Sequence, residues 1–117
     1  MDIHVLINLF HILLVSPFFI WVGVSRRNLP DGAFTACLIV GMFVFLYHAF
    51  KAFRRIMQGS SYAWVNLIHA LWVGPLLIYI GMHKKDTTRA AFELLLLTGF
   101  AALGYHLYEL VAHYDFI

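Results

Sequence analysis

The chain contains an internal duplication. Residues 4–59 align without a gap onto residues 62–117, and roughly a quarter of the aligned positions are identical. Polar residues, prolines and glycines recur in register: Asn8/Asn66, His11/His69, Pro17/Pro75, Gly23/Gly81, Gly41/Gly99, Tyr47/Tyr105 and His48/His106. Self-similarity at a fixed spacing indicates that one structural unit is built twice, so the two copies are expected to adopt the same fold.

Each copy contains two long apolar runs, at about 4–24 and 34–54 in the first copy and about 62–82 and 92–112 in the second. Each run is near the roughly 20 residues that a helix needs to cross a bilayer core of about 30 Å. A soluble helix would carry one charged face, whereas these runs are apolar on nearly all sides. Only 12% of the residues are charged and 62% are hydrophobic. The sequence therefore predicts an all-α, multi-pass integral membrane protein with four transmembrane helices.

The connections between the runs are short, so successive helices are expected to be antiparallel neighbours in an up-down-up-down bundle. Residues 1–117 would then form a single transmembrane domain made of two tandem helical hairpins. Each copy has an even number of spans, so both copies would share one membrane orientation and be related by a pseudo-two-fold axis along the membrane normal. Pro17 and Pro75 fall at equivalent points and are expected to kink the first and third helices.

Basic residues favour one membrane orientation. The two hairpin loops hold Arg26, Arg27, Lys84, Lys85 and Arg89, and the opposite side holds Lys51, Arg54 and Arg55. By the positive-inside rule, this small excess predicts that the hairpin loops are cytoplasmic and that both termini are non-cytoplasmic. The net charge of +2 gives no indication of nucleic-acid binding. The lipid bilayer is the expected partner, and the apolar helix surfaces are also compatible with a homo-oligomer or a larger membrane complex.

Four histidines lie at one predicted depth. His11 and His69 precede the midpoints of their spans by about three residues, or roughly 5 Å, and His48 and His106 follow theirs by about four residues, or roughly 6 Å. Because successive helices run in opposite directions, all four displacements point towards the same leaflet. Polar side chains are costly in lipid and usually face the bundle interior. The sequence therefore predicts four inward-facing imidazoles in one plane.

Three kinds of residue accompany the histidines: Asn8 and Asn66, Gly41 and Gly99, and Tyr47 and Tyr105. Each asparagine stands three residues before a histidine and shares its side of the helix. Each glycine stands seven residues before a histidine, on the same face, where it would allow close approach of a helix or of a flat ligand. Each tyrosine is expected to point towards a neighbouring helix.

Imidazole is a common ligand of transition metals, and neutral histidine needs no charged partner in lipid. Haem needs one or two axial histidines and space for a flat ring, which Gly41 and Gly99 would supply. A bare ion would take four imidazoles in a tetrahedral site. The leading prediction is thus a membrane protein that binds haem or a transition metal through His11, His48, His69 and His106. Electron transfer is the activity that such a cofactor would support.

Two other functions stay open. The histidines and tyrosines form a titratable set that would suit a proton or ion channel or transporter. In that case the loop-side half of each span, which is almost wholly apolar, would have to open. The chain would otherwise be a non-catalytic assembly subunit, in which histidine bonds asparagine or tyrosine across helices. There is no nucleophile–base pair and no phosphate-binding loop, so an enzyme is not favoured.

The two copies differ close to the histidines. Lys51 aligns with Glu109, one turn beyond His48 and His106, so an ion pair across the pseudo-axis is geometrically available. In the alternative, Lys51 snorkels to the membrane interface together with Arg54 and Arg55. Arg55 aligns with His113, which lies on the same face as His106. His113 would extend the polar residues towards the surface.

Overall fold

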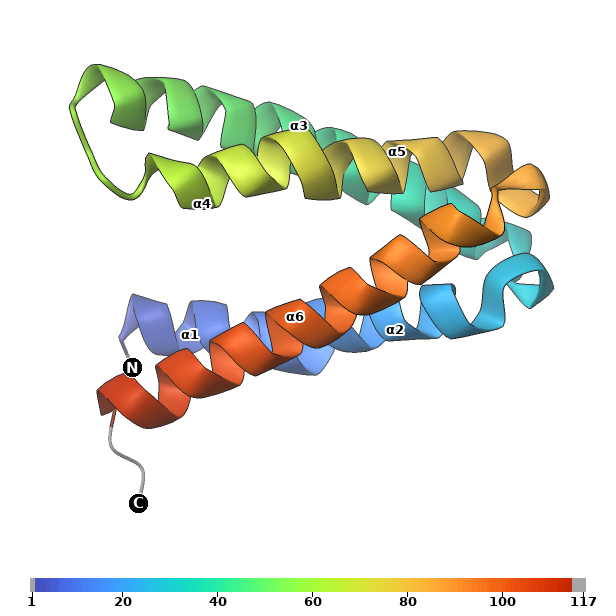
Figure 1. Cartoon of the computed structure of the whole chain (residues 1–117), viewed down its shortest axis with the longest axis horizontal. Coiled ribbons are helices and arrows are strands. Elements are labelled where there is room, and N and C mark those ends of the chain that lie inside the picture. The colour runs from blue at the N-terminus through green and yellow to red at the C-terminus, as the bar shows by residue number, and fades with distance from the viewer. Residues whose placement is uncertain (1, 115–117) are drawn as a thin grey trace. The chain divides into compact units, whose positions relative to one another are not determined.

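The computed structural model describes residues 2–114, and the side chains of residues 2–113, and the elements in this range are all helical (Figure 1). Four stretches are long and apolar enough to cross a membrane, with mean hydropathies from 1.5 to 2.2. These stretches are Ile3–Asn28, Asp31–Met57, Ala63–Asp86 and Arg89–His113. The all-helical class and the four apolar helices predicted from the sequence are confirmed.

The helices form two compact units. One, which we call the terminal unit, extends to Arg26 and resumes at Phe92, and the other, the central unit, is Arg27–Ala91. The terminal unit contains α1 (Ile3–Phe10), the π-helical segment η1 (His11–Val15), α2 (Ser16–Ser25) and most of α6 (Arg89–Tyr114). The central unit contains α3 (Asp31–Met57), α4 (Ala63–Ile68), the π-helical segment η3 (His69–Val73) and α5 (Gly74–His83).

Each unit pairs one helix from each sequence copy. In the central unit, α3 of the first copy packs against α4, η3 and α5 of the second copy, as the short connection between them predicts. In the terminal unit, α1, η1 and α2 of the first copy share a unit with α6 of the second copy. The hairpin of a single copy is therefore not a packing unit. The axis that would relate the copies concerns both units and stays a prediction.

Glycines mark the closest helix contacts in the central unit. A Cβ on Gly81 would lie 2.6 Å from the backbone nitrogen of Leu38, and a Cβ on Gly41 would lie 2.8 Å from the backbone nitrogen of Ile78. Carbon atoms do not approach this closely, so any larger residue would push α3 and α5 apart. Antiparallel packing follows from the order of these contacts, since the earlier residue of α3 meets the later residue of α5.

The terminal unit repeats this packing at the equivalent positions. A Cβ on Gly23 would lie 2.7 Å from Cβ of Leu96, and a Cβ on Gly99 would lie 3.0 Å from Cγ1 of Ile20. Gly41 and Gly99 were predicted to allow close approach of a flat ligand or of a helix. In the structure the facing helix occupies this space at both glycines.

Each proline-containing helix has a π-helical segment ahead of its proline. The segments η1 and η3 both begin at a histidine, and Pro17 and Pro75 stand two residues after their ends. Proline lacks the N–H that would bond the carbonyl one turn earlier, and its ring crowds that carbonyl. A wider π-helical turn accommodates this crowding and is frequent at functional sites. The expected kinks therefore take the form of π-helical turns that start at His11 and His69.

The first helix of each copy ends in the same uncommon backbone conformation. Arg26 has φ 52° and ψ −123°, and Lys84 has φ 52° and ψ −125°. Glycine usually occupies this region, because a Cβ is crowded there. Both copies therefore leave the helix by the same tight turn, with a basic residue in the turn.

Candidate histidine centres

The central unit brings two imidazoles and one amide together, and we call this group the central centre. The rings of His48 and His69 stack, with centroids 4.3 Å apart and an interplanar angle of 22°. Asn66, which is only 2% exposed, donates from Nδ2 to Nδ1 of His48 at 2.9 Å. His69 donates from Nδ1 to the carbonyl oxygen of Val65 at 2.7 Å. Both histidine side chains are half-buried.

The terminal unit contains an equivalent group, the terminal centre. The rings of His11 and His106 stack, with centroids 4.1 Å apart and an interplanar angle of 22°. His106 donates from Nδ1 to Oδ1 of the buried Asn8 at 2.8 Å. His11 donates from Nδ1 to the carbonyl oxygen of Ile7 at 2.8 Å. The duplicated residues thus form duplicated contacts, each between the two sequence copies.

All four predicted histidines and both asparagines belong to these centres. The structure gathers the histidines as two stacked pairs, one in each unit. Stacking was not expected from the sequence, which predicted the depth of each histidine and its helix face but not the partner of each ring. The arrangement of all four rings in one plane concerns both units and stays a prediction.

The hydrogen bonds of His11 and His69 fix the position of the ring proton. A carbonyl oxygen only accepts, so Nδ1 carries the proton in both rings. The lone pair of the neutral ring is then on Nε2. Metal-ligating histidines are commonly held in this way, with the second nitrogen donating to a carbonyl or carboxylate oxygen.

Arg55 determines which nitrogen of His48 carries the ring proton, and it does so through its hydrogen bond to Asn66. Nη1 of Arg55 donates to Oδ1 of Asn66 at 2.8 Å. Arginine has only donors, so the amide oxygen must face Arg55 and the amide nitrogen must face His48. Nδ1 of His48 therefore accepts, and the proton of the neutral ring is on Nε2. The sequence analysis did not assign Arg55 to the site, although it stands near the turn that brings the two helices together.

The terminal centre has His113 at the position that aligns with Arg55. His113 contacts Oε2 of Glu109 through Nε2 at 3.2 Å. The two centres are therefore equivalent in position, and in the central centre an arginine fixes which end of the amide faces the histidine.

The other predicted residues lie beside the centres. Tyr47 meets the edge of His48 with ring centroids 5.1 Å apart, and Tyr105 meets the edge of His106 at 5.2 Å. Lys51 donates from Nζ to the hydroxyl of Tyr47 at 3.4 Å. The expected ion pair between Lys51 and Glu109 would join the two units, and it stays a prediction.

Within residues 2–114, no three His, Cys, Asp or Glu side chains are grouped so that they could hold a metal ion. A tetrahedral four-histidine site would join the two units, and it stays a prediction. Each centre offers two imidazoles. No protein-family model, curated protein or solved structure matches the chain. The functional argument therefore depends on the geometry of the two centres.

Proposed function

We propose that this chain is an integral membrane protein that binds haem through its two histidine centres. The observation that supports this proposal best is the pair of Nδ1 hydrogen bonds made by His11 and His69. In both copies a carbonyl of the preceding turn holds the imidazole with its Nε2 as the ligating atom. A single imidazole is enough to hold a haem iron, so one ring of each centre would suffice. Electron transfer is the activity that a haem would supply here.

We assign haem binding to His69 and, by its equivalent position and hydrogen bond in the first copy, to His11. The rings of one centre lie face to face, so the two would not hold one iron together. One ring of each centre would therefore ligate, and the second would orient it by stacking. In the central centre the ligand is His69, because Nε2 of His48 carries its proton.

An absorption spectrum of protein purified from haem-replete cells tests this proposal. We expect a Soret band that decreases in His11→Ala and in His69→Ala and is absent from the double variant. His48→Ala should retain more haem than His69→Ala, since only His69 is assigned as a ligand. His83→Ala is the matched control, because His83 is exposed and lies outside both centres. A colourless preparation that contains no bound metal by mass spectrometry would contradict the proposal.

A proton relay is the second candidate, and the hydrogen bond between Lys51 and Tyr47 beside His48 favours it. Tyr47 and Lys51 extend the polar contacts of the central centre towards the membrane edge. Proton flux into liposomes, measured with a pH-sensitive dye, distinguishes the two functions. A relay predicts that His48→Ala and His106→Ala both reduce the flux, whereas unchanged flux in both variants removes the relay.

The membrane orientation belongs to the same proposal. Five basic residues in the hairpin loops against three on the opposite side support cytoplasmic loops and non-cytoplasmic termini. Cys37 is the single cysteine and is buried, so it gives little background for cysteine-labelling experiments. A cysteine introduced at Asn28 should react with an impermeant maleimide only after the cytoplasmic face is exposed. Labelling from the outside of intact cells would reverse the orientation.

A further inference from the structure

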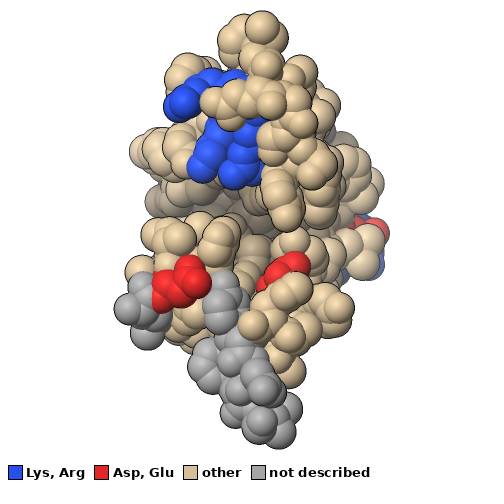
Figure 2. Space-filling model, turned by 90° about the vertical axis from the view of Figure 1, so that its left-hand side faces the viewer, with Lys and Arg blue, Asp and Glu red and all other residues tan. Residues whose placement is uncertain are grey.

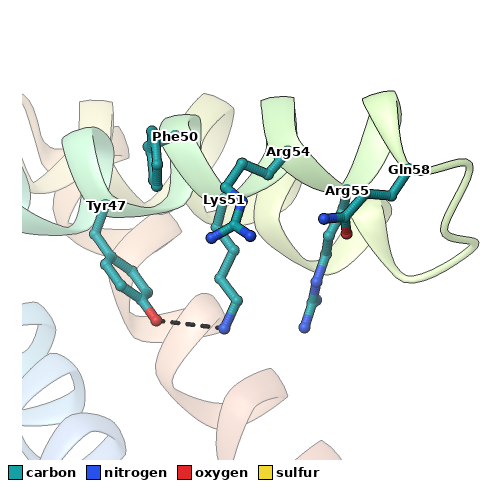
Figure 3. Close-up of a pocket in the computed structure, with 6 residues that line it drawn as sticks. All are labelled: Tyr47, Phe50, Lys51, Arg54, Arg55 and Gln58. Carbon is teal, nitrogen blue, oxygen red and sulfur yellow. Dashed lines mark hydrogen bonds between the residues drawn. The ribbon is translucent and has the colours of Figure 1, made fainter.

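A basic pocket lies on the last turns of α3, at the end of the span. It has a volume of about 280 Å³. Figure 2 shows Lys and Arg side chains gathered at this end of the central unit, and Figure 3 shows the side chains that line the pocket. They are Tyr47, Phe50, Lys51, Arg54, Arg55 and Gln58.

The three cations of this pocket have neutral partners. Lys51 donates to the hydroxyl of Tyr47, and its ammonium lies 5.6 Å from the centre of the same ring. The guanidinium of Arg54 lies 5.9 Å from the ring centre of Phe50. Arg55 donates to Asn66. Within the central unit, none of the three forms an ion pair with a carboxylate, so three positive charges share this pocket with neutral partners.

The helix end alone does not explain this arrangement. Basic residues in the last turn complement the negative end of the helix dipole, which would account for Arg54 and Arg55. Lys51 stands before that turn and behaves differently. A lysine that snorkels extends towards the membrane edge. In Figure 3 the side chain of Lys51 instead extends straight away from the helix, and its ammonium bonds the hydroxyl of Tyr47, which stands one turn nearer the middle of the span.

The second copy lacks this charge pattern. Lys51, Arg54 and Arg55 align with Glu109, Ala112 and His113. The equivalent end of α6 therefore has one acidic residue where α3 has three basic ones. A role in holding the shared fold would be expected in both copies. The cluster of three basic residues is a property of the first copy only.

We propose that this pocket binds the phosphate group of an anionic membrane lipid. Ammonium, guanidinium and phenol groups are all donors that suit phosphate oxygens, and basic pockets at the membrane edge are known to bind lipid phosphates. Phe50 lines the pocket, and exposed apolar side chains continue from it along the same side of the helix at Phe53 and Met57, where acyl chains would lie. A lipid supplies both the anion and the apolar tail, whereas free phosphate supplies only the anion. This proposal is independent of haem binding.

Native mass spectrometry of the full chain in neutral detergent tests the proposal. The probes are dioctanoyl phosphatidylglycerol, dioctanoyl phosphatidylcholine and inorganic phosphate. We expect one phosphatidylglycerol to bind, at least tenfold more tightly than phosphatidylcholine, and no saturable binding of inorganic phosphate in the same range. Saturable binding of free phosphate with the same affinity as the lipid would overturn the lipid as the source of the phosphate group.

The variant Lys51→Gln/Arg54→Gln removes two charges and keeps side chains of similar length. We expect it to bind phosphatidylglycerol at least tenfold more weakly, with unchanged helical content by circular dichroism. Arg54→Ala alone, at an exposed position, should give a smaller loss in the same direction. The matched control is Arg27→Ala/Lys85→Ala, which removes two exposed charges outside the pocket and should bind as the unmodified protein does. Equal binding by the pocket variants, or an equal loss in the control, would overturn the proposal.

Discussion

At the residue scale, the buried asparagines have unequal roles. Asn66 is 2% exposed and bonds both Arg55 and His48, whereas Asn8, 6% exposed, bonds His106. Removal of Asn66 therefore takes one hydrogen bond from each of two half-buried groups, Arg55 and His48, and removal of Asn8 takes one from His106.

We expect Asn66→Ala to lower the free energy of unfolding by about 1–3 kcal/mol, and by more than Asn8→Ala does, because unsatisfied buried polar groups are costly. Reversible unfolding in mixed micelles, followed by circular dichroism, gives both values. The double variant Asn66→Ala/Arg55→Gln should recover part of the loss, since it also removes the guanidinium that has lost its hydrogen bond to Asn66. A larger loss in Asn8→Ala than in Asn66→Ala would show that the bond to Arg55 contributes nothing.

The sequence predicts these residues better than it predicts their partners. Spacing places Asn8 on the face of His11 and gives the depth of each imidazole, because helix periodicity is fixed. Spacing does not decide which of the two histidines of the other copy stacks on each ring. One signal was available for the central centre: in an antiparallel hairpin, residues about equally far from the turn face each other, and His48 and His69 are about equally far from Gly59.

At the element scale, glycine decides how closely the paired helices approach. Gly81 and Gly104 are both helical glycines, but only Gly81 faces a neighbouring backbone. Around Gly104, nothing lies within 4 Å of the position that a Cβ would take. These two positions therefore separate the effect of packing from the effect of helix propensity.

Gly81→Ala should destabilise the protein by about 1–3 kcal/mol, since the added methyl would overlap Leu38 and force α3 and α5 apart. Gly104→Ala should instead stabilise it by roughly 0.5–1 kcal/mol, because alanine loses less backbone entropy in a helix. Thermal unfolding in one detergent measures both shifts. If both substitutions stabilise, the close approach of α3 to α5 is not required by the fold.

The π-helical turns are a feature of the helices that the sequence predicts only in part. Proline at position 17 or 75 predicts a disturbance in the preceding turn, because the missing N–H and the ring clash are local. Whether the helix bends or widens depends on how the neighbouring helix packs. In both copies the wide turn starts at a histidine and leaves its Nδ1 bonded to the carbonyl four residues earlier.

At the scale of the whole molecule, the hydropathy pattern along the sequence predicts four apolar helices of membrane-spanning length. Each helix packs against a helix of the other copy, which we call the helix exchange, and the hydropathy pattern does not predict this pairing. It depends on surface fit between helices, which a hydropathy pattern does not contain. Short connections favour sequential pairing and correctly predict α3 with α4, η3 and α5, but the grouping of the first and last helices in one unit follows only from the structure.

Separate expression of the two copies tests this exchange. Fragments 1–59 and 60–117 should each be poorly folded when expressed alone, because each lacks the helices with which its own helices pack. Expressed together, with an affinity tag on one fragment only, they should copurify and regain the helical content of the full chain. Two fragments that fold as independent monomers would contradict the exchange.

The difference between Arg55 and His113 also has a consequence for the design of the molecule. A symmetric assembly of two identical hairpins would have to place the same residue beside both asparagines. Fusion of the hairpins into one polypeptide removes this constraint. One site can then have an arginine bonded to its asparagine, while the other has at the same position a histidine that contacts a glutamate. Two sites of common origin are thereby free to diverge in chemistry within a single gene product.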